Sequence, residues 1–358
     1  MELRYEVAEE NLRVFVAALH CLAQVGKEVS IECEGTMQLT FRALNDAHSA
    51  SGQIVFDRSF FTHVGFRHDA PARFVPFVKC KVYVKSCCNI FRTLKHVRSV
   101  QLVFRLDGQS ALADLEQHSS LLDQSGSAND DLDELDIDCV EIVWRLNCDF
   151  EITKTHRMKV HTCQVMRAVF DRESCANRLV TRQYHLASLL GHIHHSSEVC
   201  VTCTATHVKF ESYVANVADG KAQLHTETAV ESVEFNEYVL TPSSSQIDSS
   251  VQLIFCLKEV RALLAFCKTS DILEVAFFFS SGGSPVLFAA QSTSMAKFSV
   301  EITLSTITTF LPASSQARSE EDLPLFHQAV ARGDEAKESD SSQANERYLT
   351  HSKRPRID

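Results

Sequence analysis

Apolar residues recur every three or four positions in four separate segments, and this spacing predicts four amphipathic helices. The expected helices are 11–25, 85–96, 184–193 and 258–268. In the first of them Leu12, Phe15, Leu19 and Leu22 form one apolar stripe, which a helix would turn towards a core. Between the helices lie runs in which apolar and polar residues alternate, as is typical of strands with one buried face.

The order of these elements occurs twice. A helix followed by two strands lies near the start (11–25, 29–33, 37–41) and again past the middle (184–193, 199–203, 207–210). A strand, a helix and a strand follow in each half (80–84, 85–96, 100–104 and 255–257, 258–268, 273–279). A repeat of this length predicts two similar lobes, each a sheet backed by two helices.

Two stretches break the pattern. Residues 107–138 contain ten acidic residues and no Lys or Arg, and beyond Pro312 the chain becomes rich in Ser, Ala, Glu and Arg without a repeating apolar face. Because such sequences bury too little apolar surface to offset the entropy of ordering, we expect both stretches to be disordered. The expected domains are a first lobe, a connector, a second lobe and a regulatory tail (1–161, 162–180, 181–312, 313–358).

Composition supports a cored protein with reduced thiols. The chain has 358 residues, of which 45% are hydrophobic, and its 13 cysteines follow no disulfide-like spacing. We expect no secretory signal, since the first residues are charged, and no membrane helix, since no apolar run is long enough. The net charge of −11 is concentrated in the acidic stretch, so the two lobes can still present a basic surface.

Basic residues follow the polar side of each expected helix. A solvated surface is the simpler interpretation for any one helix, but four repetitions within a duplicated architecture favour a shared basic surface. Glu9, Glu10 and Glu259 lie close to this surface and would weaken its field.

Several segments together resemble a known family. They include LHCLAQVGKEVSIE, LTFRALNDAHSASGQIVFDRSFF, CKVYVKSCCNIFRTL, KTHRMKV, AVFDRESCANRLV and FCLKEVRALLAF. In these segments the chain resembles the Rad nine family, a subunit of the nine-one-one checkpoint clamp. The resemblance spans roughly residues 11–304, apart from the acidic stretch.

The resemblance implies an α+β, two-lobed sliding-clamp fold like that of proliferating cell nuclear antigen, with antiparallel sheets outside and helices inside. It implies a nuclear, non-enzymatic protein without cofactors or a membrane. Two other clamp-like subunits would complete a heterotrimeric ring around double-stranded DNA, held without sequence preference. A clamp loader, checkpoint kinase activators and repair enzymes are the other implied partners.

The resemblance also places residues. Those expected to face DNA are Arg13, Lys85, Arg92, Lys95, Arg182, His192, Lys258 and Arg261. Lys and Arg on inward helices would give the weak, sequence-blind phosphate contacts that a sliding ring needs. A pocket for client peptides would involve Leu44, Ala168, Phe170, Cys175 and Pro285. Simple core packing for Leu44 and an ordinary turn at Pro285 are equally good interpretations.

In this family the tail is a phosphorylated arm that also directs nuclear import. Ser319 precedes three acidic residues, a context typical of acidophilic kinases, and is the candidate phosphorylation site. Lys353, Arg354 and Arg356 form a candidate import signal, although a basic C-terminus often only improves solubility.

A metal site is one alternative to these expectations. A run of His and Cys residues resembles a zinc site at first sight (His192, His194, His195, Cys200, Cys203, His207). However, Cys200 and Cys203 are an odd number of residues apart in a predicted strand, so their side chains should point to opposite faces. We therefore expect no metal site there.

Other enzyme and clamp hypotheses remain. A thiol-dependent enzyme would use Cys87 or Cys88, but neither lies in a motif for an activated nucleophile. The acids of 130–138 lack the glycine-marked loop of a calcium site. A homotrimeric replication-type clamp is the nearest rival, and self-assembly of three identical chains would favour it.

Overall fold

A computed structural model describes residues 1–34, 36–67, 75–107, 134–160, 164–173, 175–213, 224–241 and 250–307. The acidic stretch at 108–133 and the tail from 308 onward lie outside these residues, so the expected disorder there stays a prediction. The roles expected for Ser319, Lys353, Arg354 and Arg356 also stay predictions, because these residues lie outside the described part of the chain.

The first half begins with a strand, a long helix and three more strands. Its elements are β1 Glu2–Ala8, α1 Glu9–Val25, β2 Glu28–Glu34, β3 Gln38–Leu44, β4 Ala50–Asp57, the 3-10 turn η1 Arg58–Phe60, β5 His63–Arg67, β6 Val75–Tyr83, α2 Val84–Ile90, β7 Val97–Leu106, β8 Glu134–Cys148, the turn η2 Asp149–Glu151 and β9 Thr153–Lys159. The predicted apolar stripe of α1 is confirmed, because Leu12, Phe15, Leu19 and Leu22 are all buried.

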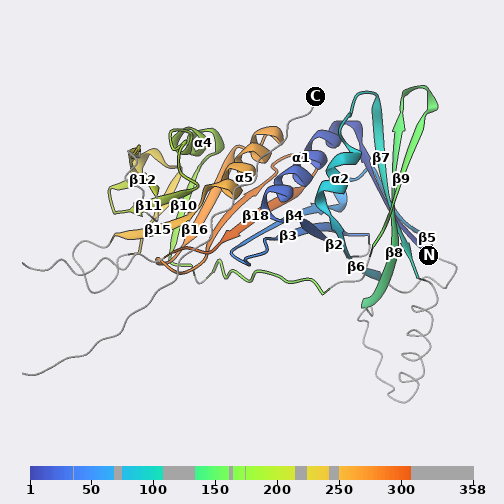
Figure 1. The fold of residues 1–358 in the computed structure, drawn as a ribbon, viewed down its shortest axis with the longest axis horizontal. Helices are drawn as coiled ribbons and strands as arrows, with labels where there is room; N and C mark the ends of the chain where they lie inside the picture. Colours follow the sequence, from blue (N-terminus) through green and yellow to red (C-terminus); the bar gives the residue numbers. More distant parts are fainter. Residues whose placement is uncertain are drawn as a thin grey trace, which may run out of the picture. The chain divides into compact units, whose positions relative to one another are not determined.

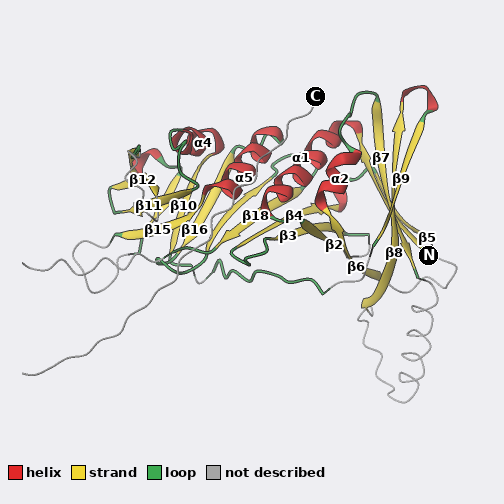
Figure 2. Cartoon of the chain, in the orientation of Figure 1, coloured by secondary structure: helices red, strands yellow, loops and turns green. Residues whose placement is uncertain are grey.

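The second half repeats this order of helices and strands. In both halves the helices lie on the same side of the strands (Figure 2). Its elements are β10 Asn177–Arg182, α4 Gln183–Gly191, β11 Glu198–Cys203, β12 His207–Tyr213, β13 Glu227–Glu231, the turn η3 Ser232–Glu234, β14 Glu237–Val239, β15 Val251–Cys256, α5 Leu257–Thr269, β16 Glu274–Phe279, β17 Val286–Gln291 and β18 Phe298–Leu304. Strand β1 thus corresponds to β10, β4 to β13 and β9 to β18, three correspondences that the repeat in the sequence did not include.

Strand pairing also repeats. Strand β2 lies between β3 and β6 in the first half, and β11 lies between β12 and β15 in the second. A 14-stranded sheet runs in the order β14-β10-β16-β17-β18-β4-β3-β2-β6-β8-β7-β1-β5, with β9 on β8, and a second sheet has the order β13-β12-β11-β15. The pairs are antiparallel except for β6 with β8.

The two halves are joined by antiparallel pairing of β18 with β4, from Phe298 opposite Phe56 to Leu304 opposite Ala50. Aromatic rings surround the first of these pairs. The Phe298 ring lies 6.1 Å from Phe56 and 5.8 Å from Phe266 of α5, measured between centroids. Because this cluster combines side chains of both halves, they share one core at the junction.

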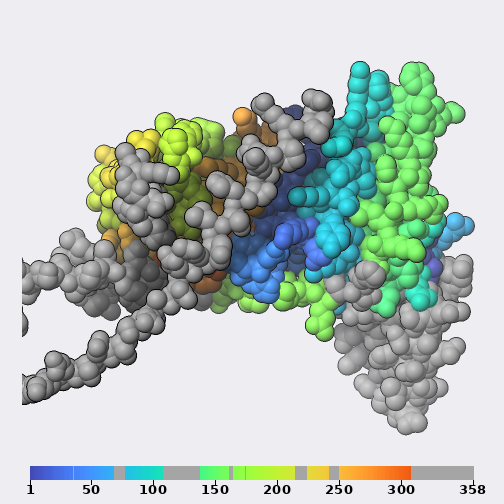
Figure 3. Space-filling view, viewed as in Figure 1, coloured from blue at the N-terminus to red at the C-terminus, as the bar shows by residue number. Residues whose placement is uncertain are grey.

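The four helices within the described residues pack in the row α2-α1-α5-α4 on one face of the sheets (Figure 1). None of them has the length and apolar character needed to cross a bilayer. The described part of the connector, 164–173, runs along the opposite face without helix or strand (Figure 3). Its Arg167 pairs with Glu32 of β2 at 2.5 Å, and its Arg172 pairs with Glu301 of β18.

Three boundaries differ from the sequence prediction. The helix expected at 85–96 ends at Ile90, and a turn follows in which His96 has a left-handed φ of 68°. Strand β8 begins at Glu134, so 134–138 are strand instead of part of the acidic insertion, because β6 pairs with them in parallel. Strand β10 begins at Asn177, so the last residues assigned to the connector belong to the sheet.

Candidate nucleic-acid interface

The helix row carries exposed basic side chains on the side turned away from the core. Burial of Leu12, Phe15 and Leu19 fixes α1 against the sheet, and the polar side of its turns is left to solvent. All eight residues predicted to face DNA are described and exposed: Arg13, Lys85, Arg92, Lys95, Arg182, His192, Lys258 and Arg261. Whether they contact DNA is not tested by their exposure.

The elements that hold these residues vary. Arg13 lies on α1, Lys85 on α2, and Lys258 and Arg261 on α5. The remaining four lie at helix ends or just beyond: Arg92 and Lys95 follow α2, Arg182 precedes α4 and His192 ends it. Because α2 is shorter than predicted, Arg92 and Lys95 belong to a turn and not to a helix face.

Basic residues inside the four helices have no acidic partner among the described residues. They are Arg13, Lys85, Lys258, Arg261 and Lys268. On the strands and the connector, by contrast, most arginines are ion-paired, including Arg42, Arg98, Arg105, Arg157, Arg167, Arg172 and Arg178. An unpaired, exposed cation keeps its full charge available to an external anion, so the helix row is a surface suited to bind one.

Acidic residues within the same helices are few. Glu9 is engaged by Arg98 at 2.8 Å, and Glu259 is buried with one carboxylate oxygen lacking a partner in the described part of the chain. Among the described residues of the four helices, Glu10 is the remaining exposed acid, and it forms no ion pair there. Arg98 therefore offsets the charge of Glu9, and the weakening of the field expected from that residue is smaller than the sequence suggested.

Two of the predicted cations are held in place. Nη1 of Arg182 donates to the Tyr184 hydroxyl at 3.1 Å, and this contact raises the pKa of the guanidinium group. Nη2 of Arg261 donates to the Ile193 carbonyl, which ties α5 to the end of α4. Arginine retains four further N–H donors after such a bond, so Arg261 can still bind an anion.

Lys268 is not among the residues that were predicted from the sequence to face DNA. This residue is exposed at the end of α5, seven positions after Arg261, on the same helix. Two helical turns separate the residues, so both side chains lie near one face. That spacing was visible in the sequence and could have added Lys268 to the set.

Several strands pair with a single neighbour strand in the described part of the chain, among them β5 and β14. Two of these edge strands, β9 and β13, correspond in the repeat to β18 and β4. Their charges are opposite: β9 carries Lys154, His156, Arg157 and Lys159 without an acid, whereas β13 and the following turn carry Glu227, Glu231 and Glu234 without a base. The sequence reasoning named neither edge, because pairing partners are set by tertiary structure.

The predicted client pocket is divided. Leu44 lines a cavity of 140 Å³ that is closed from the connector side by Gln164 and Met166. Ala168, Phe170, Cys175 and Pro285 do not line this cavity. The connector is extended, so residues four apart are separated by up to about 13 Å. Cys175 instead contacts the end of β16, with its Sγ 3.2 Å from the Phe279 carbonyl oxygen.

The cysteines have surroundings unlike those of an activated nucleophile. Burial raises the pKa of Cys87 to about 12, and it also raises the pKa of Cys88. A reactive cysteine requires the opposite shift, towards the thiolate. Cys203 belongs to the core of its lobe, whereas Cys200 lies on the other face of β11 near Glu211, as the odd spacing predicted.

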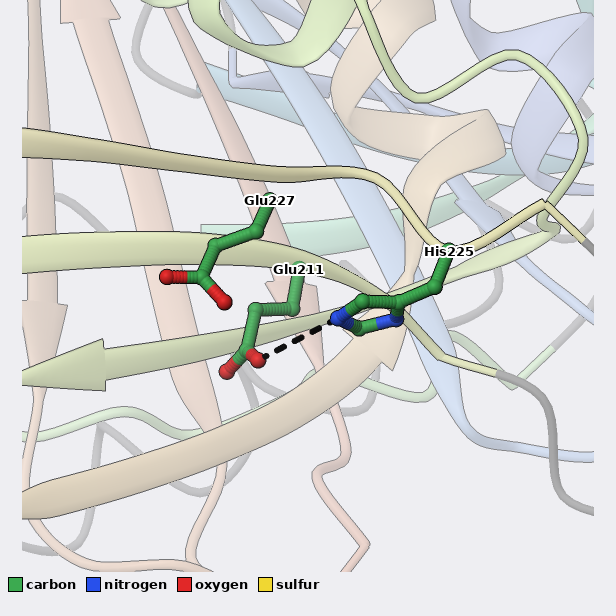
Figure 4. Close-up of side chains that lie close together, drawn as sticks. All are labelled: Glu211, His225 and Glu227. Carbon is green, nitrogen blue, oxygen red and sulfur yellow. Dashed lines mark ion pairs between the residues drawn. The ribbon is translucent and has the colours of Figure 1, made fainter.

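A different set of potential metal ligands occurs on β12 and β13 (Figure 4). Glu211, His225 and Glu227 bring one ligand atom each within 4.8 Å of one another. Lys209 Nζ lies 3.1 Å from Glu211 and 3.7 Å from Glu227, so one ammonium group is already paired with both carboxylates. This arrangement fits an ion-pair network, since a bound cation would face the charge of Lys209.

The chain is similar in sequence to proteins of one known family. A family model described as Rad9 matches residues 15–307. The chain is 24% identical to "Cell cycle checkpoint control protein Rad9" of Drosophila melanogaster, covering 80% of this chain and 53% of that protein. It is 22% identical to "DNA repair protein rad9" of Schizosaccharomyces octosporus, covering 85% and 69%. The chain thus spans about half the length of the fly relative.

Solved structures with the same fold are sliding clamps. A chain of the PCNA2-PCNA3 complex from Sulfolobus tokodaii superposes with a TM-score of 0.56 at 9% identity, covering 85% of this chain and 98% of that one. PCNA from Thermococcus kodakaraensis gives 0.55 at 9% identity, covering 85% and 99%. The predicted two-lobed clamp fold is confirmed.

Proposed function

The chain belongs to the Rad9 family, and we propose that it is a subunit of a DNA-damage checkpoint clamp. It assembles with two other clamp-like subunits into a ring around double-stranded DNA and recruits checkpoint signalling and repair proteins. It acts in the nucleus, without catalysis or a cofactor. The observation that carries the proposal is the row of four helices, in which the Lys and Arg side chains of α1, α2 and α5 lack acidic partners among the described residues.

A surface of this kind suits a ring that slides. Contacts to phosphate depend on charge and are independent of sequence, so they hold the duplex without fixing the clamp at one site. Cations spread over α1, α2 and α5 give many weak contacts in place of one strong pocket. The eight residues expected to face DNA are the proposed contact set, with Lys268 as an addition.

The internal repeat supports ring assembly. Strands β18 and β4 join the two halves of the chain, and their counterparts in the repeat are β9 and β13. Each of these counterparts has one side without a partner strand in the described residues. We infer that neighbouring subunits continue the sheet at β9 and at β13, repeating between chains the junction that β18 and β4 form within this one.

Charge supports different neighbours at the two edges. The internal junction contains apolar and neutral pairs such as Phe298 with Phe56, whereas β9 is basic and β13 is acidic. A neighbour at β9 would therefore present an acidic strand, and a neighbour at β13 a basic one. Two copies of this chain also satisfy this rule, so oligomeric state must be measured to separate a heterotrimer from the homotrimeric rival.

A sizing experiment separates these assemblies. The full chain purified alone is compared, by native mass, with the complex that it forms with clamp-like chains from nuclear extract. The proposal predicts one copy of this chain and two different partners in each ring. A stable ring of three identical chains would favour the replication-type clamp.

The cavity at Leu44 is the proposed starting point for client recruitment. The connector covers it with Met166, whose side chain is 59% exposed and therefore open to an incoming peptide. Ala168, Phe170, Cys175 and Pro285 remain proposed as outlying contacts. The acidic stretch at 108–133, Ser319 and the basic C-terminus are proposed regulatory elements.

The DNA proposal is tested by charge reversal on the helix row. In the purified complex, Lys85→Glu combined with Lys258→Glu should weaken binding to a blunt duplex by at least about tenfold near physiological salt, because several phosphate contacts are lost. The matched control is Lys81→Glu, which reverses an exposed lysine on β6 that is paired with Glu28. Equal loss in both variants would contradict the assignment of the helix row.

A further inference from the structure

A slot lies between α4 and α5 on the helix row. Its volume is 340 Å³, and its floor is made by Ala187, Leu190, Gly191, Leu264 and Ala265. Small side chains create this space: a Cβ placed on Gly191 would have no atom within 4 Å. The side chain of Gln183 closes part of the floor and is itself fixed by a 3.0 Å bond to the Leu264 carbonyl oxygen. The slot is thus a built feature of the packing of the two helices.

The rim of the slot is cationic. Arg261, Lys268 and His194 line it, all three are exposed, and no acidic residue does. Arg261 is held against the end of α4 by its bond to the Ile193 carbonyl, so its position is fixed before any ligand arrives. An apolar floor under a positive rim suits a ligand that combines an uncharged flat body with an attached anion.

Two other cavities of the described chain have a different character. The one at Leu44 includes Glu28 and Asp46, and another on the outer face of β10, β16 and β18 includes Glu274 and Glu301. In both cavities acidic and basic groups are mixed, and ion pairs such as Arg172 with Glu301 and Lys81 with Glu28 leave less positive charge for a phosphate. Of these three cavities, only the slot between α4 and α5 has basic residues and no acidic residue in its lining.

A nucleotide has the required chemistry, because its base is flat and weakly polar on its faces and its phosphate is anionic. In an intact duplex the bases are stacked and paired, so only the phosphates can reach a helix surface. An unpaired nucleotide can turn its base towards an apolar surface and keep its phosphates on basic residues. The slot is large enough for one small aromatic ring system.

We propose that this slot binds an unpaired nucleotide of single-stranded DNA, with the base over Ala187, Gly191 and Ala265 and the phosphates on Arg261, Lys268 and His194. The proposal rests on the DNA-clamp function above and makes it more specific: this subunit distinguishes a junction between single-stranded and duplex DNA from a plain duplex.

The test compares two probes on the purified complex that contains the full chain. One probe is a blunt duplex, and the other is the same duplex with a single-stranded oligothymidine tail. Fluorescence anisotropy at a fixed salt concentration should show tighter binding of the tailed probe by about tenfold, the scale expected for burying the face of one base against an apolar floor. Absence of this preference in the unmodified complex would overturn the proposal.

Filling the slot identifies the site. Ala265→Leu adds bulk at an exposed helix position, so the fold should tolerate it, and Gly191→Leu fills the same slot from α4. Both should abolish the preference for the tailed probe and leave the affinity for the blunt duplex unchanged. The matched control is Ser188→Leu, which adds the same bulk at an exposed position of α4 that does not line the slot.

The outcomes separate the two proposals. If the filled variants keep the preference for the tail, the slot assignment is wrong and the clamp function stands. If the unmodified complex binds neither probe, the clamp function fails and the slot assignment fails with it.

Discussion

At the residue scale, Glu32 is the most constrained charge in the described part of the chain. Its side chain is 5% exposed and is paired with Arg42 of β3 and with Arg167 of the connector. A carboxylate in that position is satisfied only while both guanidinium groups remain in place. The connector is therefore attached to the outer face of β2 by the buried charge of Glu32. This ion pair holds the part of the connector that lines the cavity at Leu44.

We predict that Glu32→Gln lowers the free energy of unfolding by about 1–3 kcal/mol, since two partly exposed guanidinium groups lose their counter-ion but can regain water. Urea denaturation measures this change. The control is Glu28→Gln on the same strand, whose partner Lys81 is well exposed, and it should cost less than about 1 kcal/mol. Similar losses in the two variants would contradict the role assigned to Glu32.

Buried thiols make the fold less stable at alkaline pH. Burial raises the pKa of Cys87, Cys203 and Cys267 from the ordinary value of 9.0 to about 12. Between these values the unfolded chain loses thiol protons that the folded chain keeps. The free energy of unfolding therefore falls as the pH rises, by about 1.4 kcal/mol per pH unit for each such thiol.

The thermal midpoint should therefore fall as pH is raised above about 9. Cys87→Ala should lower the midpoint at neutral pH, because it leaves a small cavity, and should reduce the slope above pH 9 by the share of one thiol. The slope is the informative quantity. An unchanged slope in Cys87→Ala would show that this thiol does not titrate as its burial implies.

At the element scale, the junction of β4 and β18 depends on a close approach that only glycine allows. A Cβ on Gly52 would lie 2.9 Å from Ile302 Cδ1 and 3.1 Å from Val25 Cγ2, both shorter than an ordinary van der Waals contact, so these side chains would have to shift. Both neighbours are buried in the core that the two halves share. Strand β4, strand β18 and helix α1 meet at this residue, so its size limits how closely the halves can pack.

We expect Gly52→Ala to destabilise the fold by about 1–3 kcal/mol through overpacking. Gly191→Ala is the matched control, because its Cβ would meet open space and alanine favours the helix, giving a gain of up to about 1 kcal/mol. Thermal melts of the two variants should shift in opposite directions. A shift in the same direction would contradict the packing described for the junction.

Sequence patterns predicted those elements whose bounds depend on interactions between residues close together in the chain. The α1 helix was predictable because Leu12, Phe15 and Leu19 recur with helical spacing. The end of α2 at Ile90 was not, since it depends on the left-handed turn at His96, whose Nδ1 lies 2.9 Å from Asp149, a residue 53 positions away. The parallel pairing that makes residues 134–138 a strand is likewise a long-range contact.

The candidate site was predictable in kind but not in arrangement. Exposed basic positions such as Arg13, Lys85 and Lys258 follow from helical spacing. Which cations lack acidic partners follows only from the fold, because pairs such as Arg172 with Glu301 join distant segments. The slot between α4 and α5 was missed for the same reason: its small residues lie on two helices more than sixty positions apart.

At the scale of the whole molecule, the two charged edges predict how a ring forms. Lys154→Glu together with Lys159→Glu on β9 should weaken association with one neighbour by about tenfold at low salt, with a smaller effect at high salt where charges are screened. Association at β13 should be unchanged. The control is Lys297→Glu, an exposed lysine in the loop between β17 and β18. Surface plasmon resonance with each partner chain separates the two interfaces.

The central claim is that a duplex passes through a ring lined by α1, α2, α4 and α5. The most direct measurement is retention of the purified clamp complex on closed circular DNA before and after a single cut. The account predicts that loaded complexes stay on the circle in high salt and leave once the DNA is linear, because a ring is held by topology and slides off an end. Equal retention on circular and linear DNA, or release from the circle in high salt, would contradict it.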